Sequence, residues 1–125
     1  MTTDDLNKLT ERVIGIAISV HKQLGPGLAE KIYQRVLYLE LKKAGISFER
    51  ECKIVVKWGK VIVGYHIVDF KINNILIVEI KATGETQELH KYQLLSYLKA
   101  ANNPLGLLLN FGTTVLGIKR VVNNL

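Results

Sequence analysis

The amino-acid sequence predicts an α/β fold in which a mixed β-sheet is flanked by helices, and three observations lead to it. The first part of the chain repeats its apolar residues at intervals of three and four, the period of an amphipathic helix. From Phe48 the period changes to two, which is typical of strands. A later helical segment separates the third strand from the fourth, and such a crossover is what a parallel pair of strands requires.

Turn and breaker residues divide the chain into eight elements. Gly25-Pro26-Gly27 ends the first helix, Gly45 ends the second, and Gly59-Lys60 and Asn73-Asn74 are turns between strands. The predicted helices cover about residues 5–24, 28–44 and 87–101, the last with Thr86 as its N-cap, and the predicted strands cover about residues 48–58, 61–70, 75–81, 105–110 and 115–122. The order is therefore α-α-β-β-β-α-β-β, in one domain over residues 1–125.

Composition limits the classes of protein that fit. Hydrophobic residues make up 48% of the chain and charged residues 22%, enough for a core and against disorder. The single cysteine, Cys52, excludes an internal disulfide, and it has no second Cys or nearby His at zinc-ligand spacing. No apolar run approaches the roughly 20 residues of a membrane span, and the N-terminus lacks the basic start of a signal peptide. We expect a soluble, cytoplasmic protein without a membrane partner.

The net charge of +6 favours a polyanionic partner, because lysine and arginine neutralise phosphates and release counterions. Many basic domains bind no polyanion, so the charge alone does not identify nucleic acid as the partner.

The segment 75–81 is the most strand-like in the chain, and it carries charges where a central strand should be apolar. Glu79 and Lys81 are two residues apart, so their side chains project from one face of the strand. Burying a lone charge costs several kcal/mol by rough estimate, so another group must share this face.

Asp69, in the preceding apolar strand, can meet Glu79 in only one of two registers. A two-residue turn at Asn73-Asn74 would place Asp69 opposite Val78, whereas a three-residue turn centred on Asn74 pairs Asp69 with Glu79. Asn tolerates left-handed backbone geometry, and we predict the second register.

Two carboxylates and a lysine at a strand end suit a site for Mg²⁺, which takes carboxylate oxygens, waters and substrate phosphate as ligands. The alternative is an ordinary cross-strand salt bridge between Lys81 and an acid. Glu30 falls between Leu37 and Leu41 in the apolar arc of its helix, but so does Glu40, so spacing alone does not single out Glu30.

The segment Gly27-Leu28-Ala29-Glu30-Lys31-Ile32-Tyr33 resembles the signature of the GxxExxY protein family, a branch of the PD-(D/E)XK nuclease-like superfamily. The segments Ile77–Ala82, Gln93–Ala100 and Leu109–Gly112 also resemble that family, in the right order. The resemblance extends from about residue 8 to residue 122 and implies a restriction-endonuclease-like core.

The resemblance also implies roles for individual residues. Asp69 would be the main ligand of Mg²⁺, for which Mn²⁺ can substitute, Glu79 the second ligand, and Glu30 a helix-borne acid near the metal. Lys81 would be the catalytic lysine, and Gln93 would lie close to the site.

Three further residues are candidates for contact with a substrate. Tyr97, one helical turn after Gln93, and the pair Lys119 and Arg120 are candidate substrate contacts, although such basic pairs usually face solvent. Tyr33 is expected to pack beside Glu30.

The three histidines are left out of the site. His66 and His90 show no spacing that indicates metal or nucleophilic chemistry, and His21 is expected on the surface of the first helix.

Three functions follow as hypotheses. The first is a Mg²⁺-dependent nuclease that hydrolyses phosphodiester bonds of nucleic acid, DNA in preference to RNA. The second is a catalytically inactive module that keeps the fold and binds nucleic acid. The third is a dimerising module, and a homodimer is compatible with both of the others. Fold resemblance by itself does not establish activity.

Overall fold

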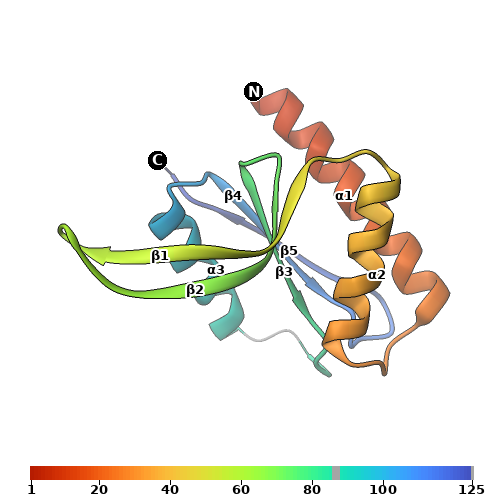
Figure 1. The fold of residues 1–125 in the computed structure, drawn as a ribbon. Coiled ribbons are helices and arrows are strands. Elements are labelled where there is room, and N and C mark those ends of the chain that lie inside the picture. Colours follow the sequence, from red (N-terminus) through yellow and green to blue (C-terminus); the bar gives the residue numbers. More distant parts are fainter. Residues whose placement is uncertain (86–87, 125) are drawn as a thin grey trace.

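The computed structural model describes residues 1–85 and 88–124 (Figure 1). Its elements are α1 (Thr3–Leu24), α2 (Glu30–Lys43), β1 (Phe48–Trp58), β2 (Val61–Ile72), β3 (Leu76–Lys81), α3 (Glu88–Ala101), β4 (Leu105–Asn110) and β5 (Gly117–Val122). The predicted fold class and element order are confirmed. The predicted N-cap, Thr86, lies outside the described residues.

The five strands form one mixed sheet in the order β1-β2-β3-β4-β5. Neighbouring strands are antiparallel except β3 and β4, which are parallel and are joined through α3, the predicted crossover helix. The helices α1 and α2 cover one face of the sheet and α3 covers the other (Figure 1). No described helix is long and apolar enough to span a membrane.

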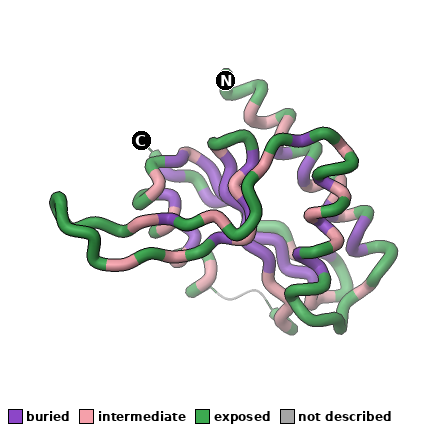
Figure 2. The backbone as a smooth tube through the Cα atoms, in the orientation of Figure 1, coloured by how far each residue is buried: buried purple, intermediate pink, exposed green. Residues whose placement is uncertain are grey.

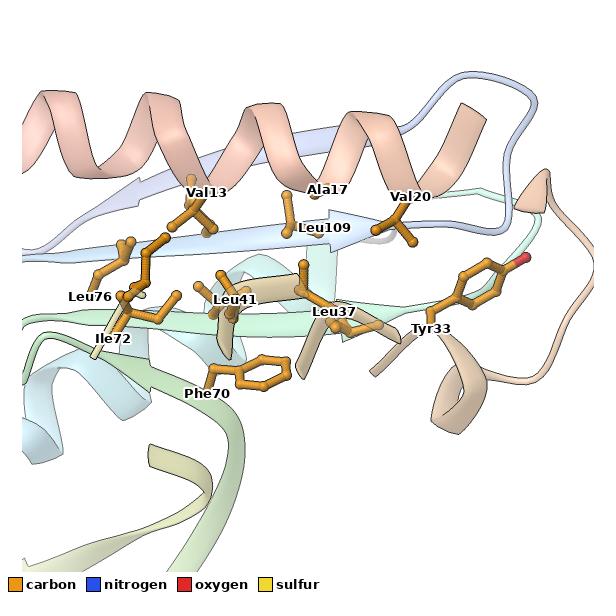
Figure 3. Packing of buried hydrophobic residues seen from close by; sticks show 14 of the residues in the cluster. Val13, Ala17, Val20, Tyr33, Leu37, Leu41, Phe70, Ile72, Leu76 and Leu109 are labelled. Carbon is orange, nitrogen blue, oxygen red and sulfur yellow. The ribbon is translucent and has the colours of Figure 1, made fainter. Parts of the chain in front are cut away.

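The larger core lies between the sheet and the two N-terminal helices (Figure 3). Val13, Ala17 and Val20 of α1 and Leu37 and Leu41 of α2 are almost completely buried there. They repeat at helical spacing, which is why the sequence predicted both helices. Burying one such leucine or valine stabilises the fold by about 1.5–3 kcal/mol.

His21 belongs to this core, so the prediction that it lies on the surface is wrong. Its ring is buried, lies 5.9 Å from the ring of Phe111, and forms a hydrogen bond of 2.9 Å between Nε2 and the carbonyl oxygen of Thr113. The partner comes from a distant loop, which helical spacing could not reveal.

Tyr33 fixes the loop that leads into α2. Its hydroxyl donates to the carbonyl oxygen of Gly25 at 2.5 Å and accepts from the N–H of Leu28 at 3.1 Å. Its ring stacks on Phe111 with centroids 4.7 Å apart. Tyr33 is therefore a buried packing residue, and it holds the start of α2, where Glu30 lies.

The strand β2 turns about its own axis at Asp69. In a regular strand, Val68 and Phe70 would face the same side of the sheet. Phe70 instead packs under α1 and α2, whereas Val68 packs in the cluster under α3. The pairing of β1 with β2 skips Glu51, the residue opposite Asp69, and Glu51 has a left-handed φ of 53°. Beyond this point, residues 52–68 form a two-stranded arm that projects past the rest of the sheet (Figure 1).

The backbone after β3 is clamped to the backbone after β4. The N–H of Phe111 donates to the carbonyl oxygen of Lys81 at 2.8 Å. The side-chain oxygen of Asn110 accepts from the N–H of Thr83 at 3.1 Å and from that of Gly112 at 3.0 Å. A Cβ at Gly112 would lie 2.3 Å from the carbonyl oxygen of Thr83, so only glycine fits there.

We expect Gly112→Ala to lower the free energy of unfolding by about 1–3 kcal/mol or more, because backbone must move to admit the methyl group. Gly64→Ala is the matched control, since nothing lies within 4 Å of its added Cβ. Urea denaturation of both variants measures the difference, and equal stabilities would contradict the clamp.

Candidate functional site

Asp69 and Glu79 meet at the point where β2 leaves β3. The ladder between these strands contains the pairs Phe70↔Val78, Lys71↔Ile77 and Ile72↔Leu76, which is the predicted register with Asp69 opposite Glu79. The turn is formed by Asn73 and Asn74, with φ of 50° and 61°.

Beyond Phe70, carboxylates replace the backbone pairing. Oε1 of Glu79 accepts from the N–H of Asp69 at 3.0 Å, and Oδ2 of Asp69 accepts from the N–H of Ile80 at 2.7 Å. Each acid therefore satisfies a backbone donor on the opposite strand, and both carboxyl groups are held in place.

Gln34 of α2 also contacts Asp69, and the sequence interpretation missed it. Its Nε2 donates to Oδ1 of Asp69 at 2.7 Å, and the residue is buried. A signal was present, because Gln34 lies three residues before Leu37 and seven before Leu41, which places a polar side chain on the core-facing stripe of the helix. The gap between β2 and β3 lets this side chain reach Asp69.

Glu30 lies at the rim of the site, one turn of helix before Gln34. The residue is exposed at the first position of the helix, although it lies four residues before Gln34 and seven before Leu37, on the arc of α2 that faces the sheet. Partial burial of its carboxyl group raises its pKa, as does the charge of Asp69, while Lys81 lowers it. These couplings show that Glu30, Asp69 and Lys81 are neighbours.

Lys81 ends β3 and is half-buried. Among the residues that the structure describes, no ion pair within 4.0 Å joins Lys81 to an acid. The alternative of an ordinary salt bridge is therefore not what this strand end contains. The ammonium group instead acts at longer range, lowering the pKa of both central acids.

Both central acids, Asp69 and Glu79, have a raised pKa. The pKa of Glu79 is raised from its ordinary 4.5 to about 8, first by burial and then by the nearby charge of Asp69. The hydrogen bond from the N–H of Asp69 and the charge of Lys81 lower this pKa, but they do not outweigh the two raising effects. Burial also raises the pKa of Asp69, opposed by its hydrogen bonds from Ile80 and Gln34. Without a cation, this pair holds a proton near neutral pH.

Two histidines that the sequence interpretation excluded lie near Lys81. Burial and the charge of Lys81 lower the pKa of His66 and of His90. The ring of His66 on β2 stacks on Tyr97 of α3 with centroids 3.9 Å apart. Burial and the charge of Glu79 raise the pKa of Tyr97, which has this acid in its surroundings. Sequence spacing could not reveal this cluster, because the arm and α3 meet only in the folded chain.

The remaining candidates are less closely placed. Gln93 is half-buried on α3, one turn before Tyr97. Lys119 is exposed on β5, whose neighbour β4 separates it from β3. Arg120 donates from Nη2 to Oδ1 of Asn7 on α1 at 2.7 Å, which directs it away from the two acids.

The donor set fits a hard divalent cation. A positive charge favours the ionised forms of two carboxylates whose pKa values burial has raised. Mg²⁺ is often held by only one or two protein carboxylates, with waters and phosphate completing its shell. Within the described residues, no three His, Cys, Asp or Glu side chains are already arranged as a metal cluster. Asp69 and Glu79 are thus the residues that would hold a cation.

A mixed sheet with helices on both faces, and two acids and a lysine at the end of a central strand, define a nuclease-like α/β protein. Residues 7–121 match the family model of the PD-(D/E)XK nuclease superfamily, and the chain belongs to this superfamily. The crystal structure of SSO0001 has a similar fold, with a TM-score of 0.60 and 22% identity over 76% of this chain and 50% of that one. The chain thus spans half the length of SSO0001. No curated protein matches the sequence.

The raised pKa of Glu79 predicts how stability depends on pH in the absence of metal. Between about pH 4.5 and 8 the folded chain holds a proton that the unfolded chain has released, so the free energy of unfolding falls as the pH rises through this range. Glu79→Gln keeps an oxygen that can accept from Asp69 and removes the titration. In EDTA, we expect the melting temperature of this variant to exceed that of the wild type by several degrees more at pH 8.5 than at pH 5. A difference that is the same at both pH values would contradict the shift.

Proposed function

We propose that this protein is a Mg²⁺-dependent nuclease that hydrolyses phosphodiester bonds of nucleic acid, DNA in preference to RNA. Membership of the PD-(D/E)XK nuclease superfamily supports the nuclease class. The observation that carries the proposal is the convergence of Asp69 and Glu79, joined through backbone amides, beside Lys81, which forms no ion pair within 4.0 Å in the described part of the chain.

Each residue of the candidate site would have its own role in metal binding, hydrolysis or substrate contact. Asp69 and Glu79 would hold the cation, and the hydrogen bonds from Gln34 and from the N–H of Ile80 fix the orientation of the Asp69 carboxylate. Lys81 would orient the attacking water or stabilise charge on the phosphate. Glu30, at the rim, is a third acid for the site, and Gln93 and Tyr97 are candidate substrate contacts from α3.

A bound Mg²⁺ or Mn²⁺ supplies a positive charge that polarises the phosphoryl group and lowers the pKa of a bound water. We place the chain in the GxxExxY branch of the superfamily on the segment Gly27–Tyr33, and we expect a single domain in a cytoplasmic setting.

The second candidate is a nuclease fold that binds nucleic acid without cleaving it. The net charge of +6 supports binding equally well in either case. This candidate predicts salt-sensitive binding that is unchanged in Asp69→Ala, with no cleavage in Mg²⁺ or Mn²⁺. A homodimer is compatible with both candidates.

Metal binding can be measured without knowing the substrate. We expect calorimetric titration with Mn²⁺ to show binding to the wild type and at least tenfold weaker binding to Asp69→Asn, which retains an oxygen to accept from Ile80 but lacks the charge. The titration is repeated with a DNA duplex present, because phosphate can complete the shell. Equal affinities for wild type and variant in both titrations would remove Asp69 as a ligand.

Cleavage tests the lysine. We expect Lys81→Ala to lower the cleavage rate by about a hundredfold or more, the loss typical of removing one group that stabilises transition-state charge, with an unchanged melting temperature. Lys8→Ala is the matched control, because it removes an exposed lysine near the start of α1 that pairs with Asp4, and it should cleave normally. Unchanged cleavage by Lys81→Ala would reject its assigned role.

A further inference from the structure

The outer part of β2, residues 61–68, is paired on one side only. Its partner on that side is β1, and the ladder with β3 begins at Phe70. Val68 at its inner end is buried, but its other apolar side chains are largely in solvent: Val61 is 64% exposed, Ile62 63%, Val63 62%, Tyr65 60% and Ile67 52%. Figure 2 shows the arm as mostly exposed. This segment is therefore a free strand edge with apolar side chains beside it.

Charges protect the other edges of the sheet but not this one. Free edges are normally protected against pairing by charged residues, proline or bulges. The outer edge strand β1 carries Glu49, Arg50, Glu51, Lys53 and Lys57, and the opposite edge strand β5 carries Lys119 and Arg120. Residues 61–68 of β2 contain no Asp, Glu, Lys, Arg or Pro. The ladder with β1 shifts register between Val56 and Lys57, which leaves Val63 in a bulge. Residues 64–68 pair regularly with β1 and carry no charge, and this leaves the edge open to pairing with another strand.

We propose that this edge pairs antiparallel with the same edge of a second copy of the chain, forming a two-fold symmetric homodimer. A free edge in an antiparallel arrangement is complementary to itself about a two-fold axis, so no second kind of surface is needed. The pairing joins the two arms into a four-stranded sheet and places the exposed valines and isoleucines of the two copies beside one another on its faces.

The positions of the lysines favour a second copy over nucleic acid as the occupant of this edge. The lysines of the arm are Lys53 and Lys57 on β1 and Lys60 in the turn, and none lies on the β2 edge itself. In the dimer the two β1 strands are outermost, about 14 Å apart at three strand spacings, which exceeds the Debye length of about 8 Å at physiological salt. The antiparallel pairing places the two Lys60 residues at opposite ends.

The dimer would place two copies of the candidate site at a fixed separation. The meaning of that separation rests on the proposed nuclease function, whereas the proposal of the dimer does not rest on it. If the axis passes near residues 63–65, each Asp69 lies four to six residues from it. The two sites are then roughly 25–40 Å apart along the joined strands, comparable with one turn of duplex DNA at about 34 Å. Two copies could thus present both sites to one duplex.

Sedimentation equilibrium of the intact chain at 5–100 µM tests the proposal. We expect the wild type to reach twice the monomer mass, and Ile62→Lys and Val63→Lys to remain at the monomer mass at the same concentrations. Val115→Lys is the matched control, because Val115 is 78% exposed in a loop outside the arm, and it should still dimerise. Unchanged circular dichroism and melting temperature show that each variant is folded.

Disulfide trapping gives a second readout that does not depend on affinity alone. In a Cys52→Ser background, Val63→Cys should form a covalent dimer under mild oxidation, because residues near the axis of an antiparallel pair approach within disulfide range. Lys57→Cys on β1 should not form a covalent dimer.

A monomeric wild type at 100 µM overturns the proposal, and so does a dimer that both lysine variants leave intact. If the chain is monomeric and Ile62→Lys alters duplex DNA binding, the edge belongs to nucleic acid instead. None of these results depends on cleavage, so failure of the dimer and failure of the nuclease proposal are distinguishable.

Discussion

Two hydrogen bonds between carboxylates and backbone amides, across the point where β2 leaves β3, are the contacts on which the rest of the site depends. The strands pair normally up to Phe70 and Val78, and there the side chains of Asp69 and Glu79 take over the role of the ladder. A buried amide needs a partner, and a buried carboxylate needs donors. One pair of contacts meets both needs, so the strands can separate without leaving orphaned donors at this point, and the separation makes room for groups from α2 and α3.

The separation of β2 from β3 also explains why residues from both faces of the sheet contribute to the site. Gln34 reaches Asp69 from the helical layer of α1 and α2, while Tyr97 and His66 stack on the side of α3. The twist at Asp69 carries the arm from the larger core to the smaller one. The same twist removes β3 as a neighbour of residues 61–68 and so creates the free edge. The geometry of the acids and the exposure of the arm thus have one structural origin.

The electrostatic state of the site follows from the burial of two acids with too little positive charge nearby. Lys81 and the backbone donors favour the ionised forms, but burial and mutual repulsion outweigh them for Glu79. A fold built for stability alone would replace such a pair with apolar residues, since a buried pair of like charges costs free energy. Groups with perturbed pKa values in this kind of arrangement are typical of functional sites, and the superfamily membership is consistent with that interpretation.

The sequence by itself determined the order of the elements, the crossover helix and the register that pairs Asp69 with Glu79, because periodicity, turn residues and a central strand with misplaced charges are local signals. Glu79 and Lys81 were visible for that reason. Only the tertiary structure decided that Gln34 contacts Asp69, that His66 stacks on Tyr97, and that His21 is buried against the loop at Thr113. Each of those contacts joins residues at least 31 positions apart. The first two also involve β2, so they depend on how strongly this strand twists at Asp69. Strict alternation along the strand would have placed Val68 with Phe70, and no local pattern records that the strand turns between them.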